Sequence, residues 1–144
     1  MVKSRLVCCC QTPVWRSILL LNLLSVGLGG FIGASLRYAT GLFVGRFFTD
    51  AQFPYGTFVV NMVGCLLIGF LAGVTDSRDL MNDTSRAFVF TGMLGAFTTF
   101  STFSYETMGL LQNGQTSPAL TNLVLQIILG LLGVWIGIQL SKIF

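Results

Sequence analysis

The charged residues of this sequence are placed so unevenly that they leave four long apolar stretches. Apart from Arg37 in the first stretch and Glu106 in the third, these stretches contain no Asp, Glu, Lys or Arg. A helix needs about 20 mainly apolar residues to cross the ~30 Å hydrocarbon core of a bilayer, and each stretch is long enough. The sequence therefore predicts four transmembrane helices, approximately at residues 18–44, 56–75, 87–111 and 119–141.

The composition supports a lipid bilayer as the surroundings of this chain. Only 9% of its 144 residues are charged and 53% are hydrophobic, whereas about 25% of the residues in soluble domains are charged. The sequence has no His, which removes the commonest general base and metal ligand. Its net charge of +3 is not gathered into a basic stripe, so nucleic acid is not an expected partner. We expect an all-α integral membrane protein that is not an enzyme.

The connections between the predicted spans are too short to hold a further domain. An even number of spans places both termini and the middle connection on the same side of the membrane. Six of the eight Lys and Arg residues fall on that side, namely Lys3, Arg5, Arg16, Arg78, Arg86 and Lys142. The positive-inside rule then favours termini in the cytoplasm. We expect a multi-pass protein of the cell (inner) membrane. Three of the six precede residue 17, so the charge bias of the remaining chain is weak.

Residues 1–16 are expected to form a flexible extension ahead of a single membrane domain at residues 17–144. Basic residues followed by an apolar stretch resemble a signal peptide, but Pro13 interrupts the pattern and no convincing small-residue cleavage site follows. An uncleaved extension or a misassigned start is therefore the favoured interpretation. Cys8–Cys10 are candidates for acylation near the bilayer rather than for a metal site.

The second span carries polar side chains that need an explanation, because polar groups inside a membrane are costly. Thr57 and Asn61 lie four residues apart and share one helical face, which Gly64 continues. Asn61 could hydrogen-bond to a neighbouring helix and hold the two helices together. It could equally line a path for a ligand, and the sequence leaves both alternatives open.

The third span contains an unusual run of hydroxyl side chains. Five Ser and Thr residues fall between Thr98 and Ser104, shortly after Gly92 and Gly95. Glycine weakens a helix, and Ser and Thr can bind backbone groups that a break releases. Non-helical backbone at membrane depth persists only where it is buried or lines a cavity. We therefore predict a mid-membrane break near Gly95, with carbonyl groups able to hold a small cation.

The aromatic residues Phe97, Phe100 and Phe103 recur every three positions and are predicted to form a ridge on this span. Packing against lipid or protein is one explanation. The alternative uses the positive edge of the ring, which can stabilise a small anion without a full charge that would trap it.

Glycines four residues apart indicate close contact between helices. Such pairs occur at Gly29/Gly33, Gly41/Gly45, Gly69/Gly73 and Gly133/Gly137. The first span is also long enough to tilt, or to break near its glycines. Because four helices with polar faces cannot enclose those faces well by themselves, an oligomer is expected.

Three segments make the chain resemble the Fluc (CrcB-type) family of fluoride channels. They read GGFIGASLRY at residues 29–38, PYGTFVVNMVG at 54–64 and GMLGAFTTFSTFSYE at 92–106. The TTFSTFS run after a pair of glycines is the most specific of these signals. The resemblance extends from about residue 27 to the end of the chain.

The resemblance implies a dual-topology, antiparallel homodimer whose two pores let fluoride leave the cytoplasm passively and so reduce its toxicity. It also implies a central Na⁺, structural and not transported, held by the backbone carbonyls of Gly95 and Thr98 from both subunits; oxygen ligands suit such a hard cation. The implied fluoride path consists of Asn61 as a hydrogen-bond donor, Phe100 and Phe103 as edge-on rings, and Thr57, Ser101, Thr102 and Glu106 as polar lining. Arg37 would lie toward an aqueous mouth, or would extend its charge to the membrane surface.

The resemblance leaves part of the fourth span unassigned. Asn122 and Gln126 stand there in place of the Ser or Thr that the family often has, so the contribution of this span to the pore is open. An alternative function is a proton-coupled small multidrug exporter, for which Glu106 would be the membrane carboxylate. A non-conducting membrane subunit would explain the glycine pairs but not the hydroxyl run together with Asn61.

Overall fold

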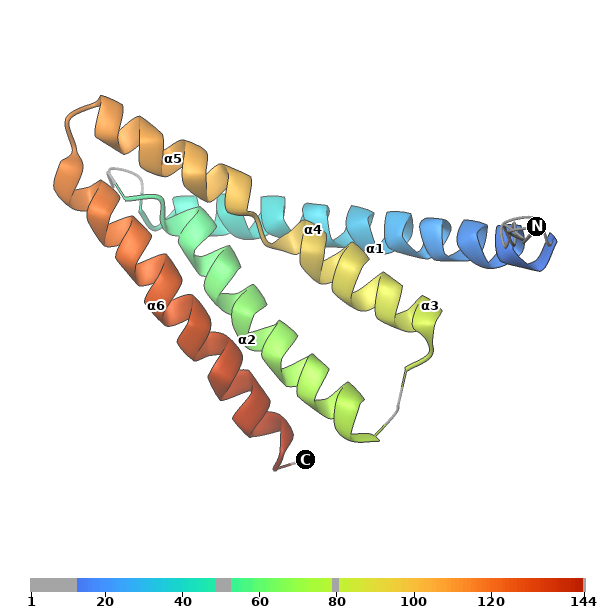
Figure 1. The fold of residues 1–144 in the computed structure, drawn as a ribbon. Coiled ribbons are helices and arrows are strands. Elements are labelled where there is room, and N and C mark those ends of the chain that lie inside the picture. The colour runs from blue at the N-terminus through green and yellow to red at the C-terminus, as the bar shows by residue number, and fades with distance from the viewer. Residues whose placement is uncertain (1–12, 49–52, 79–80, 144) are drawn as a thin grey trace, which may run out of the picture.

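The computed structural model describes residues 13–48, 53–78 and 81–143, and every regular element within those ranges is a helix. In chain order the elements are α1 (Pro13–Gly45), α2 (Tyr55–Arg78), α3 (Asp83–Arg86), the π-helix η1 (Ala87–Leu94), α4 (Gly95–Phe97), α5 (Phe100–Gln112) and α6 (Thr116–Ser141) (Figure 1). The elements η1, α4 and α5 correspond to the third apolar stretch of the sequence, and α3 immediately precedes it.

Four helical segments are long and apolar enough to cross a membrane, which confirms the number of spans that the charge pattern predicts. They cover Ser17–Gly45, Tyr55–Arg78, Asp83–Gln112 and Thr116–Ser141. The first helix, α1, continues without a break through all of its glycines and already begins at Pro13, a residue type suited to a helix start. The cysteines Cys8–Cys10 and the rest of residues 1–12 lie outside the described residues.

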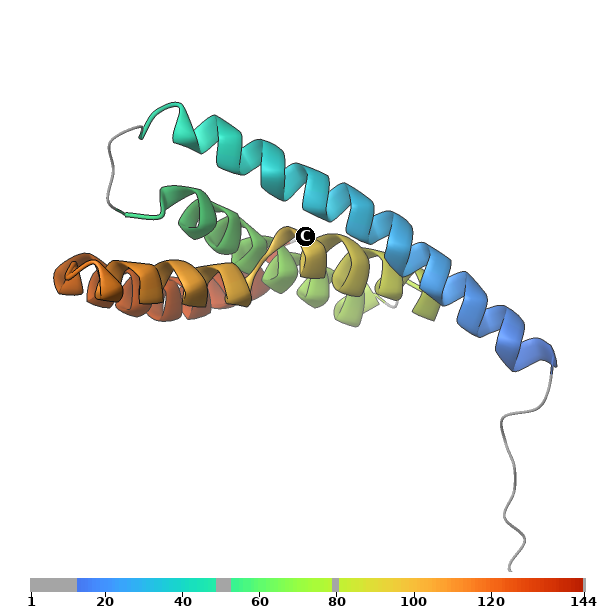
Figure 2. The ribbon, with the colours of Figure 1, turned by 90° about the horizontal axis from the view of Figure 1, so that it is seen from above.

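The long helices pack in two main groups. The helices α2 and α6 lie side by side, and α1 runs along η1 and α4 (Figures 1 and 2). A Cβ added at Gly33 on α1 would collide with the backbone of η1, and one added at Gly69 on α2 would collide with the backbone of α6. Glycine at these positions therefore permits the close approach in both groups. By contrast, nothing among the described residues lies within 4 Å of a Cβ added at Gly41 or Gly45. Gly41 nevertheless lies close to α2, because a Cβ added at Gly56 would be 3.5 Å from the Gly41 Cα.

The burial pattern is the reverse of that in a soluble protein. Asn122 on α6 is 0% exposed, whereas Leu131 on the same helix is 69% exposed and Phe31 on α1 is 74% exposed. Apolar side chains on this scale are stable outside only against lipid or another apolar surface. Among the buried polar side chains, Thr107, Asn122 and Gln126 lie where α2, α5 and α6 face one another.

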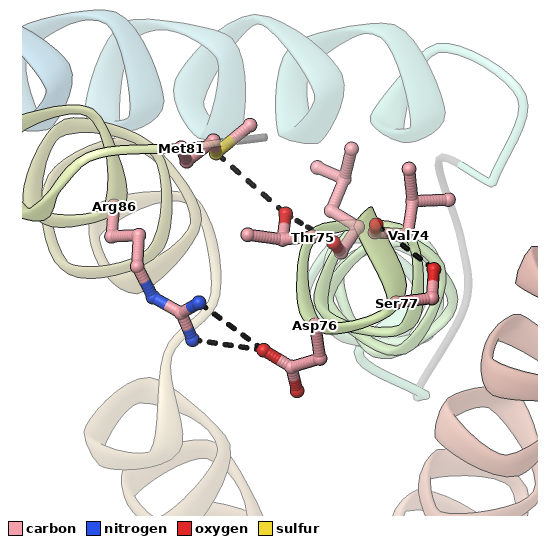
Figure 3. Close-up of polar contacts among 7 residues, drawn as sticks. Val74, Thr75, Asp76, Ser77, Met81 and Arg86 are labelled. Carbon is pink, nitrogen blue, oxygen red and sulfur yellow. Dashed lines mark hydrogen bonds and ion pairs between the residues drawn. The ribbon is translucent and has the colours of Figure 1, made fainter. Parts of the chain in front are cut away.

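Polar contacts hold the connection between α2 and α3 (Figure 3). The guanidinium of Arg86 on α3 donates two hydrogen bonds, of 3.1 and 3.2 Å, to one carboxylate oxygen of Asp76 near the end of α2. The hydroxyl of Thr75 donates to the Leu71 carbonyl at 2.7 Å, and its oxygen lies 3.7 Å from the sulfur of Met81. Because an exposed ion pair contributes at most about 1 kcal/mol, these contacts add little to the stability of the fold.

Candidate functional site

The third span is interrupted at Thr98 and Thr99, between α4 and α5 (Figure 1). Both residues have extended backbones, with φ −82° and ψ 161° at Thr98 and φ −154° and ψ 120° at Thr99. A break was predicted in this span, but its predicted position near Gly95 was wrong, because Gly95 is helical with φ −63° and ψ −36°. The cause is a helix cap rather than glycine flexibility. The hydroxyl of Thr99 accepts a hydrogen bond from the Thr102 backbone N–H at 3.3 Å and starts α5.

Asn61 on α2 binds the interrupted backbone directly. Its side-chain oxygen Oδ1 accepts from the Thr99 backbone N–H at 2.9 Å, and its Nδ2 donates to the Thr99 carbonyl at 3.1 Å. The carboxamide thus replaces, for one residue, the hydrogen bonds that a neighbouring backbone would offer. This satisfies both polar groups of a residue that neither helix includes.

Two carbonyls lose their helical donors at the break. In a continuous helix the Gly95 carbonyl would accept from the Thr99 N–H and the Thr98 carbonyl from the Thr102 N–H. Here the Thr99 N–H donates to Asn61 and the Thr102 N–H donates to the Thr99 hydroxyl. Gly95 and Thr98 are the residues whose carbonyls were predicted to hold a small cation, and these oxygens are released from the helical ladder. Within the described ranges no cluster of three or more His, Cys, Asp or Glu could hold a metal.

A ladder of side-chain hydrogen bonds continues from Asn61 across α6 to α5. Asn61 Nδ2 donates to Gln126 Oε1 at 2.9 Å, and Gln126 Nε2 donates to Asn122 Oδ1 at 3.4 Å. Asn122 Nδ2 then donates to the Thr107 hydroxyl at 2.8 Å, which donates to the Phe103 carbonyl at 2.7 Å. The two amides of the fourth span, unassigned from the sequence, therefore face the same interior as Asn61. Their spacing of four residues was the available signal.

The first hollow, of about 340 Å³, lies between α2, α5 and α6 beside the break. Its lining includes Asn61, Thr98, Thr99 and Gln126 as polar residues, and Phe100 and Phe103 as aromatic ones, and none of its described lining residues is charged. The two ring centroids are 5.6 Å apart with their planes inclined by 55°. Phe100 is 79% exposed and Phe103 is 9% exposed.

Phe97 does not join these two rings, so the predicted ridge of three aromatic residues was wrong. Phe97 is buried and lines a separate hollow together with Met93 on η1 and Leu36 on α1. The interruption at residues 98–99 lies between Phe97 and the other two rings, so the spacing of three residues no longer places them on one continuous helical face.

The second hollow, of about 470 Å³, lies on the other side of the break and carries charge. Arg37, Thr57, Thr102 and Glu106 line it, and Thr99 is common to both linings. The Thr57 hydroxyl donates to Glu106 Oε1 at 2.8 Å. The second carboxylate oxygen, Oε2, is buried and has no hydrogen-bond partner in the part of the chain that the structure describes.

The structure thus brings together all but one of the side chains predicted for the path. Ser101 is exposed and lies outside both linings. Its hydroxyl is 3.2 Å from that of Thr99, so it contacts the site only through the cap of α5.

The cap at Thr99 gives a stability prediction. Thr99→Val keeps the shape of the side chain but removes the acceptor of the Thr102 N–H, and we expect it to lower the stability of the folded protein by about 1 kcal/mol. Thr99→Ser retains the hydroxyl and should stay close to the unsubstituted protein. Thermal unfolding in detergent, followed by the loss of helical circular dichroism, compares the three proteins. Equal midpoints for Val and Ser would show that the cap does not hold the break.

Residues 24–138 match the family described as CrcB-like protein, Camphor Resistance (CrcB). The chain belongs to the CrcB family. The matched residues begin within α1 and end close to the C-terminal end of α6. They include every residue that lines the first or the second hollow. With its four apolar helices, this CrcB protein is a multi-pass membrane protein, and in bacteria such a protein lies in the inner membrane.

Curated CrcB relatives align over most of their length. A fluoride-specific ion channel FluC of Chloroflexus aurantiacus is 44% identical over 123 residues, which are 85% of this chain and 97% of the relative. The protein of the same name from Clostridium perfringens is 45% identical over 124 residues, 86% of this chain and 96% of the relative. The protein of the same name from Clostridium novyi is 46% identical over 118 residues, which are 82% of this chain and 91% of the relative.

Proposed function

We propose that this protein is a fluoride-selective channel through which F⁻ leaves the cytoplasm passively. The observation that carries the proposal is the first hollow, where a carboxamide donor and two phenyl rings meet without a charged side chain. Small anions can be stabilised there by N–H groups and positive ring edges. The absence of a full positive charge among the described lining residues keeps binding weak enough for release. The names of the aligned relatives, all fluoride-specific ion channels, support the same conclusion.

The residues of the two hollows suggest different roles along the path. The second hollow would receive the ion at an aqueous mouth, where the positive charge of Arg37 attracts it and the Thr57–Glu106 pair supplies a polar lining. Thr99 and Thr102 would pass it to the first hollow, where Asn61 donates a hydrogen bond and Phe100 and Phe103 present their edges. A negative-inside membrane potential would drive the ion outward by about 2.3 kcal/mol per charge per 100 mV. No coupling reaction is needed.

An antiparallel homodimer would complete this path. The ring of Phe100 is 79% exposed in a single protomer although it lines the first hollow, so a second copy is well placed to cover it. The weak charge bias beyond residue 16 suits a chain that inserts in both orientations. We also propose that the carbonyls of Gly95 and Thr98 from both copies hold a structural Na⁺, an ion that favours oxygen ligands. Such an ion would neutralise converging carbonyl dipoles at the break and would not move with fluoride.

Fluoride release from liposomes tests the proposal. Purified protein is reconstituted into vesicles loaded with potassium fluoride, valinomycin balances the charge, and a fluoride electrode follows the external solution; matched vesicles are loaded with chloride. We expect rapid fluoride release, no chloride release, and the same rate without a pH gradient. Fluoride retention by vesicles that contain correctly folded protein would overturn the proposal. Release that required a pH gradient would instead favour a proton-coupled exporter that uses Glu106.

A further inference from the structure

The side-chain ladder that starts at Asn61 has a fixed direction. The Thr99 backbone has an N–H to donate and a carbonyl to accept, so the Asn61 oxygen must face the N–H and its nitrogen must face the carbonyl. The side chain of Gln126 must therefore direct its oxygen toward Asn61 and its nitrogen toward Asn122. The donors therefore run in one direction, from the break through α6 to the Phe103 carbonyl.

This direction uses both N–H groups of the Asn61 carboxamide. One donates to the Thr99 carbonyl at 3.1 Å and the other to Gln126 Oε1 at 2.9 Å. A fluoride ion that accepts a hydrogen bond from Asn61 must displace one of these two oxygens. The Thr99 carbonyl belongs to the backbone at the break and cannot rotate away by itself. The Gln126 oxygen belongs to a side chain that lines the same hollow and can rotate.

We propose that Gln126 is a positioning residue whose side-chain oxygen competes with fluoride for the Asn61 N–H. The inference rests on the proposed channel function. The next contact of Gln126, to Asn122, is long at 3.4 Å, whereas Asn122 is fully buried and holds Thr107 at 2.8 Å. Gln126 is thus the loosely held member between two firmly held amides. When the ion leaves, the Gln126 oxygen takes its place on Asn61, so that the half-buried donor is never left unpaired.

The competition would help conduction because an ion must leave a site as readily as it binds there. An unpaired buried donor is costly, and a competitor that satisfies it in the absence of the ion lowers the affinity for the ion. Removing the competitor should therefore tighten fluoride binding. A stronger competitor that also repels anions should weaken it.

Two substitutions at residue 126 distinguish this role from simple packing. Gln126→Met keeps the length of the side chain and removes its oxygen; we expect the fluoride concentration that gives half-maximal efflux from liposomes to fall about three- to tenfold. Gln126→Glu keeps an acceptor and adds negative charge, and we expect that concentration to rise. Gln139→Met is the matched control, because Gln139 lies on the same helix, away from both hollows, and contacts Lys142 at 3.1 Å. Its half-maximal concentration should match that of the unsubstituted protein.

The outcomes separate the inference from the proposed function. If the unsubstituted protein releases no fluoride, the channel and this inference both fall. If it conducts, a half-maximal concentration that is unchanged or raised in Gln126→Met overturns the competition alone. Should the Met variant fail to fold, Gln126→Leu decides, because it also lacks the side-chain oxygen and adds no charge: competition requires tighter fluoride binding in it, while a packing role predicts no change.

Discussion

Replacing Asn61 by aspartate is expected to lower fluoride efflux at least about 100-fold while the protein still folds. The substitution preserves the shape of the side chain and the oxygen that accepts from the Thr99 N–H. It removes both N–H donors, and a hydrogen bond to a charged group is worth about 1.5–3 kcal/mol. Any ionised fraction would also repel the anion, by about 4 kcal/mol at 4 Å and an effective dielectric constant near 20. Efflux from liposomes at one fluoride concentration measures the loss.

The control for Asn61→Asp is the same substitution at Asn113, which is exposed at the end of α5 and lies outside both hollows. Asn113→Asp should conduct like the unsubstituted protein. Aspartate is preferable to alanine at position 61, because alanine would also free the Thr99 N–H and confuse loss of the break with loss of the donor. Undiminished efflux in Asn61→Asp would mean that Asn61 holds the helices together without touching the ion.

The sequence predicts the number of spans well because charge is excluded from a bilayer whatever the tertiary structure. It predicts less about the position of the break. The glycines near residue 95 were the visible signal for weakness, yet Gly95 remains helical. The interruption depends on the Thr99 cap and on two hydrogen bonds from Asn61, which lies 38 positions away in the sequence. A contact between distant segments cannot be read from local propensity.

The same limit explains the fourth span. Asn122 and Gln126 share a helical face, but only the packing of α6 against α2 and α5 shows that this face is buried. The π-helical geometry of η1 was not predicted either. It precedes the break, where Gly29 and Gly33 of α1 let the two backbones approach closely. Local sequence patterns identify the helices, whereas the register in which the helices pack against one another decides which polar groups meet.

Thr99 at the break lines both hollows, and this makes the ring beside it a sensitive position. Phe100 is the first residue of α5 and directly follows Thr99, the residue common to both linings. Its ring is 79% exposed in the protomer, so few contacts within the protomer depend on it. An effect of substitution on transport, in protein that still forms the dimer, should therefore reflect the ion rather than the fold of the protomer.

Phe100→Ile is expected to reduce fluoride efflux about tenfold or more. Isoleucine fills much of the same apolar space but has no positive ring edge for the anion. Phe43→Ile is the matched control, because Phe43 is also exposed, at 61%, and its ring likewise contacts a neighbouring one, Phe47, at 5.1 Å. Phe43 lies on α1 outside both hollows, so its substitution should leave efflux unchanged. Equal efflux from the two variants would mean that the Phe100 ring serves only in packing, and that Asn61 is the main contact of the ion.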